Sequence, residues 1–368
     1  MTRGADALPE GNAIVLCSGA FGTPNGKTAH GLVRFTQRYR VLSVIDPVHA
    51  GRDAGQLLNG KPNGIAVLAS VAEAIDAAER AGAAATHLVI GLTPDGGRLP
   101  DSARLEIRAA IDAGLDVDSG LHDFLTEDAV LSSRAQRRGV TLRDVRKPPP
   151  RSELHFFCGK IDDVGCARIA VLGTDSAIGK RTTAVKLVEG LREAGLDAEL
   201  IGTGQTAWMQ GVRYGIILDS LINDFVAGEI EHVIWRAWSE ARPDVIVLEG
   251  QGSLMNPAYP GGFELLAAGR PHAVVLQHAP ARKEYDGFPG FPLHPLPRQI
   301  EAIELISGRP VVAVTVNHEH LTPSETRLEC SAIKAETGLP AVDVLLDGPD
   351  ALMSALRERL VIESGRRR

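Results

Sequence analysis

The sequence predicts a protein of the α/β class with two domains, each built on a parallel sheet. Short apolar segments alternate with longer segments of helical periodicity, and this alternation is typical of parallel strands joined by crossover helices. A proline-rich stretch at residues 144–151, DVRKPPPR, divides the chain. A glycine-containing loop between a strand and a helix, RIAVLGTDSAIGKRTT at residues 168–183, dominates the second part.

Composition limits the possible functions. The chain has 368 residues, 44% of them hydrophobic, which is enough for two cores. The net charge of −7 gives no indication of nucleic-acid binding. No apolar run is long enough to span a membrane, and no signal peptide is expected. The cysteines lack C-x-x-C spacing and indicate free thiols in a reducing compartment, so we expect a cytoplasmic protein: Cys17, Cys158, Cys166 and Cys330.

In the first part of the chain, residues 1–150, short apolar segments predict strands at residues 13–17, 41–45, 65–68, 87–90 and 115–117. Helices are expected at residues 71–81 and 101–113. A loop with the segment GTPNGKT follows the first strand and carries Lys27 and His30. It is one residue short of a Walker A motif, and both an anion-binding loop and a plain loop remain open. Asp46 ends the second strand, as an acid does in dinucleotide-binding folds, but no G-x-G-x-x-G accompanies it.

Three consecutive prolines at residues 148–150 exclude helix and favour a stiff, extended connector. The sequence therefore predicts a domain boundary at residue 150, with a second domain over residues 151–368.

The loop after the first strand of the second domain has the features of a phosphate site. A glycine loop at a helix N-terminus directs backbone N–H groups and the positive end of the helix dipole at one point. Lys180 adds an ammonium group at the start of that helix. The expected phosphate-binding residues are Gly173, Thr174, Ser176, Gly179, Lys180, Arg181, Thr182 and Thr183.

This loop departs from the Walker A motif in two ways. Five residues rather than four separate Gly173 from Gly179, and Arg181 follows the lysine where Ser or Thr would bind Mg²⁺. Asp175 lies inside the loop, and its carboxylate would repel phosphate unless it faced a cation or an amine. We therefore expect phosphate binding and no metal ligands.

Later strands are expected at residues 198–201, 244–248, 273–277, 311–316 and 341–345. Helices are expected from Lys180 through AVKLVEGLREAG, which ends at residue 195, and at residues 229–241, 322–336 and 351–362. Glu249 follows the strand at 244–248, which is the Walker B position, and ligands of open α/β sheets lie at this edge. The segment HAPARKEYDGFPGFPLHP at residues 278–295 combines charged side chains with prolines and is typical of a substrate loop.

Four segments together resemble a bacterial family long labelled as a domain of unknown function: GTDSAIGKRTT, TGQTAWMQG, EGQGSLMNPAYPGG and QHAPARKEYDGFP. The resemblance covers essentially the whole chain. It implies a Rossmann-like N-terminal domain and a P-loop NTPase-like C-terminal domain similar to dethiobiotin synthetase. One branch of the family is described as a D-glutamate N-acetyltransferase that uses acetyl-CoA in D-glutamate catabolism, beside an N-acetyl-D-glutamate racemase.

The resemblance implies an amino-acid N-acetyltransferase with acetyl-CoA as donor and a small amino acid as acceptor. Amine acetylation needs a general base and donors for the developing oxyanion. We assign these catalytic roles to Glu249, Asp175 and Lys180. We expect contacts with the amino-acid substrate from Lys27, His30, Gln205, Arg213, Gln251, His278, Arg282 and Tyr285. We expect no membrane or nucleic-acid partner, and we expect the protein to form a homo-oligomer.

Two other functions remain open. The first is a ligase or kinase of the dethiobiotin synthetase type, in which Glu249 would position the magnesium of Mg-ATP and Thr182 would replace the missing hydroxyl group. The second is a nucleotide-binding regulator without catalytic activity, which would explain the loop but not the polar segment at residues 278–295. Branches of one fold can differ in chemistry, so the fold alone does not decide among the three.

Overall fold

The computed structural model describes residues 9–365, and the side chains of Asp95 and of residues 358–365 are not described. The chain divides into two compact units. The first comprises residues 1–148 together with residues 205–212, and the second comprises residues 149–204 and 213–368. Among the described residues, no helix is long and apolar enough to cross a membrane.

The first unit is built on a six-stranded sheet of order β3-β2-β1-β4-β5-β6, in which all neighbours are parallel. Its strands are β1 (Gly11–Leu16), β2 (Tyr39–Ile45), β3 (Ala66–Leu68), β4 (His87–Ile90), β5 (Asp116–Ser119) and β6 (Leu142–Asp144). Its helices are α1 (Lys27–Arg34), α2 (Ala54–Asn59), α3 (Val71–Arg80), α4 (Asp101–Asp112), α5 (Ala129–Arg138) and α7 (Gln205–Met209).

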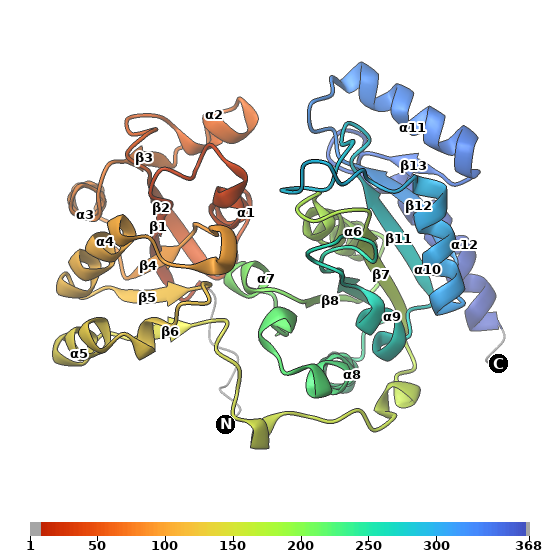
Figure 1. Ribbon diagram of the computed structural model, residues 1–368, viewed down its shortest axis with the longest axis horizontal. Helices are drawn as coiled ribbons and strands as arrows, with labels where there is room; N and C mark the ends of the chain where they lie inside the picture. The colour runs from red at the N-terminus through yellow and green to blue at the C-terminus, as the bar shows by residue number, and fades with distance from the viewer. Residues whose placement is uncertain (1–8, 366–368) are drawn as a thin grey trace. The chain divides into compact units, whose positions relative to one another are not determined.

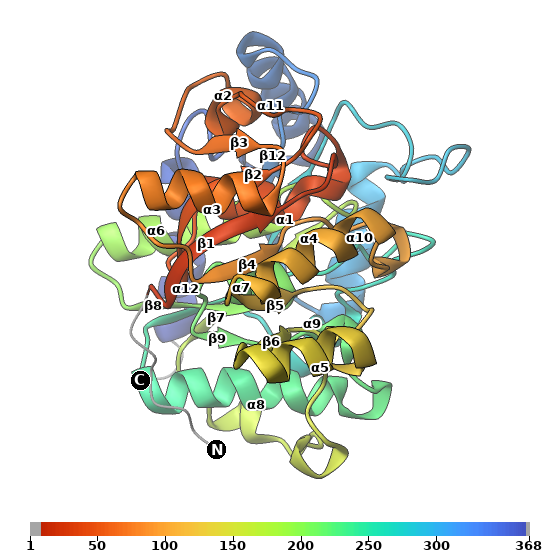
Figure 2. The same cartoon turned by 90° about the vertical axis from the view of Figure 1, so that its left-hand side faces the viewer.

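Two apolar layers cover the faces of this sheet. Along β1, Ile14 and Leu16 pack under α3, α4 and α5, whereas Ala13 and Val15 pack under α1, α2 and α7. This alternation follows from the two-residue period of a strand, and burial on both faces explains why β1 is apolar throughout. Figure 2 views this unit from the side of α3, α4 and α5, which lie next to one another across the sheet.

The second unit has a seven-stranded parallel sheet of order β13-β12-β11-β7-β10-β8-β9. Its strands are β7 (Ala167–Gly173), β8 (Ala198–Gly202), β9 (Tyr214–Gly215), β10 (Val245–Glu249), β11 (Ala273–His278), β12 (Val311–Val316) and β13 (Ala341–Val342). Its helices are α6 (Lys180–Glu193), α8 (Asn223–Ala241), α9 (Phe263–Gly269), α10 (Leu296–Ser307), α11 (Pro323–Thr337) and α12 (Asp350–Gly365).

The strand β7, which leads into the glycine loop, lies in the centre of this sheet between β10 and β11. The carboxyl ends of parallel strands meet at one edge, so the segments after β7, β10, β11 and β12 come together there. The predicted α/β fold with two parallel sheets is therefore confirmed.

One segment belongs to a different unit from the one its sequence position indicates. The sequence places residues 205–212 in the second domain, whereas their contacts group them with the first unit. Thr206 shares a hydrogen bond of 2.8 Å with Thr28, and the Arg38 guanidinium donates to the Trp208 carbonyl at 2.7 Å. The Arg38 guanidinium also stacks on the Trp208 ring, 3.8 Å from its centroid. These long-range contacts leave no signal in local periodicity.

Candidate active site

The loop between β7 and α6 is shaped by its two glycines and by Lys180. A Cβ atom on Gly173 would lie 2.8 Å from Cδ of Lys180, so glycine is required where the lysine side chain folds back over the loop. Gly179, with φ of 98°, forms the left-handed residue before the helix. The Lys180 ammonium donates to the Asp175 carbonyl at 2.7 Å, and Thr182 is half-buried on the first turn of α6.

The environment of Lys180 alters its acid–base behaviour. The residue is only 7% exposed. Burial lowers its pKa to about 8, against the opposing effect of the carboxylates of Asp175 and Glu249. The ammonium group therefore remains charged at neutral pH and loses its proton at a pH slightly above neutral.

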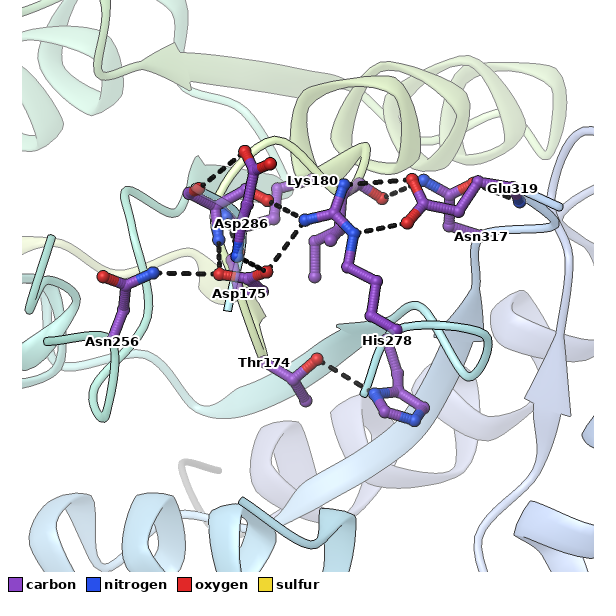
Figure 3. Close-up of polar contacts among 11 residues, drawn as sticks. Thr174, Asp175, Lys180, Asn256, His278, Asp286, Asn317 and Glu319 are labelled. Atoms are coloured by element: carbon purple, nitrogen blue, oxygen red, sulfur yellow. Dashed lines mark hydrogen bonds and ion pairs between the residues drawn. The ribbon is translucent and has the colours of Figure 1, made fainter. Parts of the chain in front are cut away.

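Asp175 has four hydrogen-bond donors around its fully buried carboxylate. One oxygen accepts from the Ser176 backbone at 2.7 Å and from the Asn256 amide at 2.9 Å. The other accepts from the Arg282 guanidinium at 2.8 Å and from the Asp286 backbone at 2.9 Å. Figure 3 shows Asp175 between Asn256 and Asp286. The carboxylate thus joins the glycine loop to the segments that follow β10 and β11, and it faces the cation that the sequence required.

Arg282 is shared between two carboxylates. Opposite Asp175, its guanidinium forms a two-pronged ion pair with Glu319, in which Nη2 lies 3.0 Å from Oε2 and Nε donates to Oε1. Burial alone would lower the pKa of Arg282, but Glu319 and Asp175 raise it above its ordinary value. Asn317 supports this arrangement, because it donates to the Ile178 carbonyl at 2.9 Å and accepts from the Glu319 backbone at 3.0 Å.

Arg181 and Glu249 form a second ion pair at the same edge. The Nη2 atom of Arg181 lies 2.9 Å from Oε1 of Glu249, whose side chain is 3% exposed. The other carboxylate oxygen accepts from the Thr203 backbone at 3.3 Å. Gln251 donates to the Thr203 carbonyl at 2.9 Å and so supports the segment after β8. The residue in the Walker B position is therefore bound by a guanidinium from the loop helix.

His278 lies at the end of β11 and shares a hydrogen bond of 2.9 Å with the Thr174 hydroxyl group. Burial, together with the charge of Lys283, lowers the pKa of His278 to about 4. The imidazole is therefore neutral at neutral pH and cannot bind a carboxylate as a cation.

Thr183 contacts the strands beneath the loop. Its hydroxyl group donates to the side-chain oxygen of Gln277, which also accepts from the Thr315 hydroxyl at 2.6 Å. Thr183 is 1% exposed, so it joins α6 to β11 and β12. The sequence assigned it to cofactor binding, and these contacts supply a structural reason for its presence.

The structure does not bring every predicted residue of the second unit to the cluster of polar side chains around the glycine loop. Tyr285 is buried and its hydroxyl shares a hydrogen bond of 2.8 Å with His294, within the segment between β11 and α10. Arg213 precedes β9 and is largely exposed, and its guanidinium pairs with Glu240 of α8 at 3.3 Å.

The other three predicted residues belong to the first unit. Lys27 is exposed at the start of α1, and His30 donates to the Phe21 carbonyl at 2.7 Å. Burial lowers the pKa of His30, although that hydrogen bond opposes the effect. Gln205 is buried at the start of α7 against Gly120, where a Cβ atom would lie 2.6 Å from its side chain. A role for these three residues in substrate binding stays a prediction.

Asp46, at the end of β2, has local partners. Its fully buried carboxylate accepts from the Phe21 backbone at 2.7 Å, from the Val48 backbone at 3.1 Å and from the His49 ring at 3.0 Å. These hydrogen bonds hold the loops after β1 and β2, which accounts for an acid at this position without a nucleotide ribose.

Sequence reasoning missed several residues of the cluster. Four residues contact the predicted ones, and each lies within three residues of a strand end or inside a glycine-rich segment: Asn256, Gln277, Thr203 and Glu319. The polar run NHEHLT after β12 was the available signal for Glu319. Its pairing with Arg282 could not be read from spacing.

Comparison with known proteins identifies the family. The domain of unknown function DUF1611 matches in both parts, its P-loop domain at residues 155–353 and its Rossmann-like domain at residues 47–148. The chain belongs to the DUF1611 family. The predicted membership is therefore confirmed.

A crystal structure of a DUF1611 family protein from Anabaena variabilis is similar over 95% of this chain and 100% of its own, with 30% identity and a TM-score of 0.87. Two curated relatives are named D-glutamate N-acetyltransferase. The protein from Tritonibacter scottomollicae is 31% identical over 289 residues, and the one from a Pseudoalteromonas species is 31% identical over 285 residues. Each match covers 76% of this chain and 83% of the relative.

Proposed function

We propose that this DUF1611 protein is an N-acetyltransferase that transfers the acetyl group of acetyl-CoA to the amino group of D-glutamate. The observation that carries the proposal is the similarity to two relatives of that name, at 31% identity over 76% of this chain. The site supports it, because a loop with two adjacent cations, Lys180 and Arg181, suits the phosphates of CoA.

In this proposal Glu249 is the general base. The acceptor must lose a proton before its nitrogen attacks the thioester carbonyl. The C–N bond then forms, the C–S bond breaks, and CoA leaves as the thiolate. Glu249 is suited to hold the ammonium and take its proton, because Arg181 and the Thr203 backbone fix the carboxylate at the end of β10.

Asp175 has a different role in this proposal from the one the sequence suggested. Its oxygens accept four hydrogen bonds from groups that hold three loops together. We therefore assign it to positioning Lys180 and the glycine loop rather than to proton transfer. Arg282 likewise positions loops, since Glu319 and Asp175 occupy its guanidinium.

The main competing function is an ATP-dependent ligase or kinase, which a P-loop domain would also suit. The two can be separated by assaying purified protein with acetyl-CoA and D-glutamate, following free thiol, and in parallel with Mg-ATP, following phosphate. We expect thiol release that requires the amino acid, with D-glutamate preferred over L-glutamate.

The Glu249→Gln variant should lose this activity roughly 100-fold or more, while Glu189→Gln, which changes a half-buried carboxylate of α6 that pairs with Lys186, should not. Phosphate release that a chelator abolishes, with no thiol release from any amino acid tested, would overturn the proposal in favour of the ligase.

A further inference from the structure

The position of a metal ion in this fold is defined by two residues. In P-loop nucleotide hydrolases, a Ser or Thr directly after the loop lysine and a carboxylate at the end of a neighbouring strand hold Mg²⁺ against the phosphates. Here the corresponding residues are Arg181 and Glu249, which follow Lys180 and end β10.

These residues do not fit a divalent cation. A guanidinium has no lone pair for a metal, and that of Arg181 lies 2.9 Å from the carboxylate that would bind one. A metal would have to displace this ion pair and would then lie beside a fixed positive charge. Of the two threonines that follow, Thr183 offers no substitute hydroxyl, because it donates to Gln277 beneath the loop, and Thr182 lies one position beyond Arg181 rather than directly after the lysine.

Arg181 also has a donor that lacks an acceptor. Its Nε–H group is buried and has no hydrogen-bond partner among the described residues. A buried donor of a charged group is costly to leave unpaired, so this arrangement of Arg181 is not its most stable one. The Arg181 side chain is 26% exposed, so the guanidinium can contact Glu249 through one nitrogen and an anionic ligand on its exposed side.

Lys180 supplies a second positive charge at the same helix start, whereas the third cation of the cluster, Arg282, is already neutralised. Two carboxylates, Asp175 and Glu319, contact it. The loop therefore presents Lys180 and a helix N-terminus toward an anion, and the Arg181 guanidinium, paired with Glu249, occupies the place that a metal would hold beside this carboxylate.

We propose that the Arg181 guanidinium takes the place of the divalent cation, and that the loop binds a diphosphate group, of the kind that CoA and ADP share, without metal. A diphosphate bound at Arg181 would lie beside Glu249, and the thioester of CoA is separated from its diphosphate by the whole pantetheine arm, so this inference and the role of Glu249 as general base are tested separately.

Calorimetry on the full chain tests it, with CoA and ADP as probes, each titrated in EDTA and in excess Mg²⁺. We expect the Kd of the tighter probe to differ less than threefold between the two conditions. Binding tightened tenfold or more by Mg²⁺, or binding of neither probe, would overturn the inference. Metal-free binding of ADP with no binding of CoA would leave it standing and refute the acetyl-CoA proposal instead.

Substitution of Arg181 provides a second test of the inference. Arg181→Thr should weaken binding in EDTA roughly 10- to 100-fold through the loss of one charged contact, and Arg181→Lys less. In Arg181→Thr the freed carboxylate and the new hydroxyl should also make ADP binding respond to Mg²⁺. The matched control is Lys186→Thr, which removes one charge from a half-buried position of the same helix, where Lys186 pairs with Glu189.

Equal losses in Arg181→Thr and Lys186→Thr would reduce the effect to overall charge and overturn the assignment. So would a lower melting temperature of Arg181→Thr with unchanged affinity, since the ion pair would then be purely structural. Arg181→Lys keeps the test valid if the threonine variant does not fold.

Discussion

Lys180 shows how one buried residue links pH, stability and binding. In the unfolded chain it has the ordinary lysine pKa of 10.5, and burial lowers this to about 8 in the folded protein. Between these values the unfolded state binds more protons than the folded state, so the free energy of unfolding contributed by this residue rises with pH. Its positive charge, which an anionic ligand needs, is lost over the same interval.

From this we predict that affinity for CoA is nearly constant below pH 8 and falls above it, by up to tenfold per pH unit until the pKa of the bound state is reached. Lys180→Ala should bind about 10- to 100-fold more weakly at neutral pH and should lack the decline that begins near pH 8. Calorimetry at several pH values measures both. A wild-type profile that is flat from pH 7 to 10 would show that Lys180 does not contact the ligand.

At the scale of elements, the second unit depends on one carboxylate to join three loops. Asp175 lies inside the glycine loop, and it binds the segments after β10 and β11 through Asn256, Arg282 and the Asp286 backbone. None of these partners is nearer than 81 residues in the sequence.

Asp175→Asn should therefore destabilise the protein by roughly 3–5 kcal/mol, because the amide replaces one acceptor oxygen by a donor that faces other donors and leaves Arg282 partly uncompensated. Hydrogen exchange should increase in residues 279–293. Asp286→Asn is the control, since only the backbone of Asp286 contacts Asp175, and its stability should remain close to that of the wild type. Unchanged exchange in residues 279–293 of Asp175→Asn would contradict the role given to this carboxylate.

The same contacts explain what could be predicted from the sequence. Lys180 and Glu249 could be predicted from the sequence. A glycine loop or an acid that directly follows an apolar strand lies at the carboxyl edge of a parallel sheet, where ligands bind. The partners of Arg282 could not be predicted. A lone arginine in a polar loop has the same local pattern whether it binds a substrate carboxylate or Glu319, and only the fold brings residue 319 to it. Short elements such as β9 and β13 were also missed or overextended, since two residues of strand leave little periodicity.

At the scale of the whole molecule, the chain enters the second unit, returns to the first for residues 205–212 and leaves again. Met209 lies in this return segment, fully buried in the apolar layer that also contains Ala29 and Leu32 of α1. A residue located by sequence in the middle of the P-loop domain therefore belongs to the core of the Rossmann-like unit.

We predict that Met209→Ala destabilises the first unit, by about 2–5 kcal/mol for the lost burial and the cavity that remains. Hydrogen exchange on the full chain should accelerate in β1, β2 and β4 and remain slow in β7, β10 and β11. Met353→Ala is the matched control, because Met353 is 5% exposed on α12 of the second unit. It should produce the opposite pattern. Faster exchange in β7 and β10 of Met209→Ala, with β1 protected, would show that the return segment stabilises the second unit and that the division of the core drawn here is wrong.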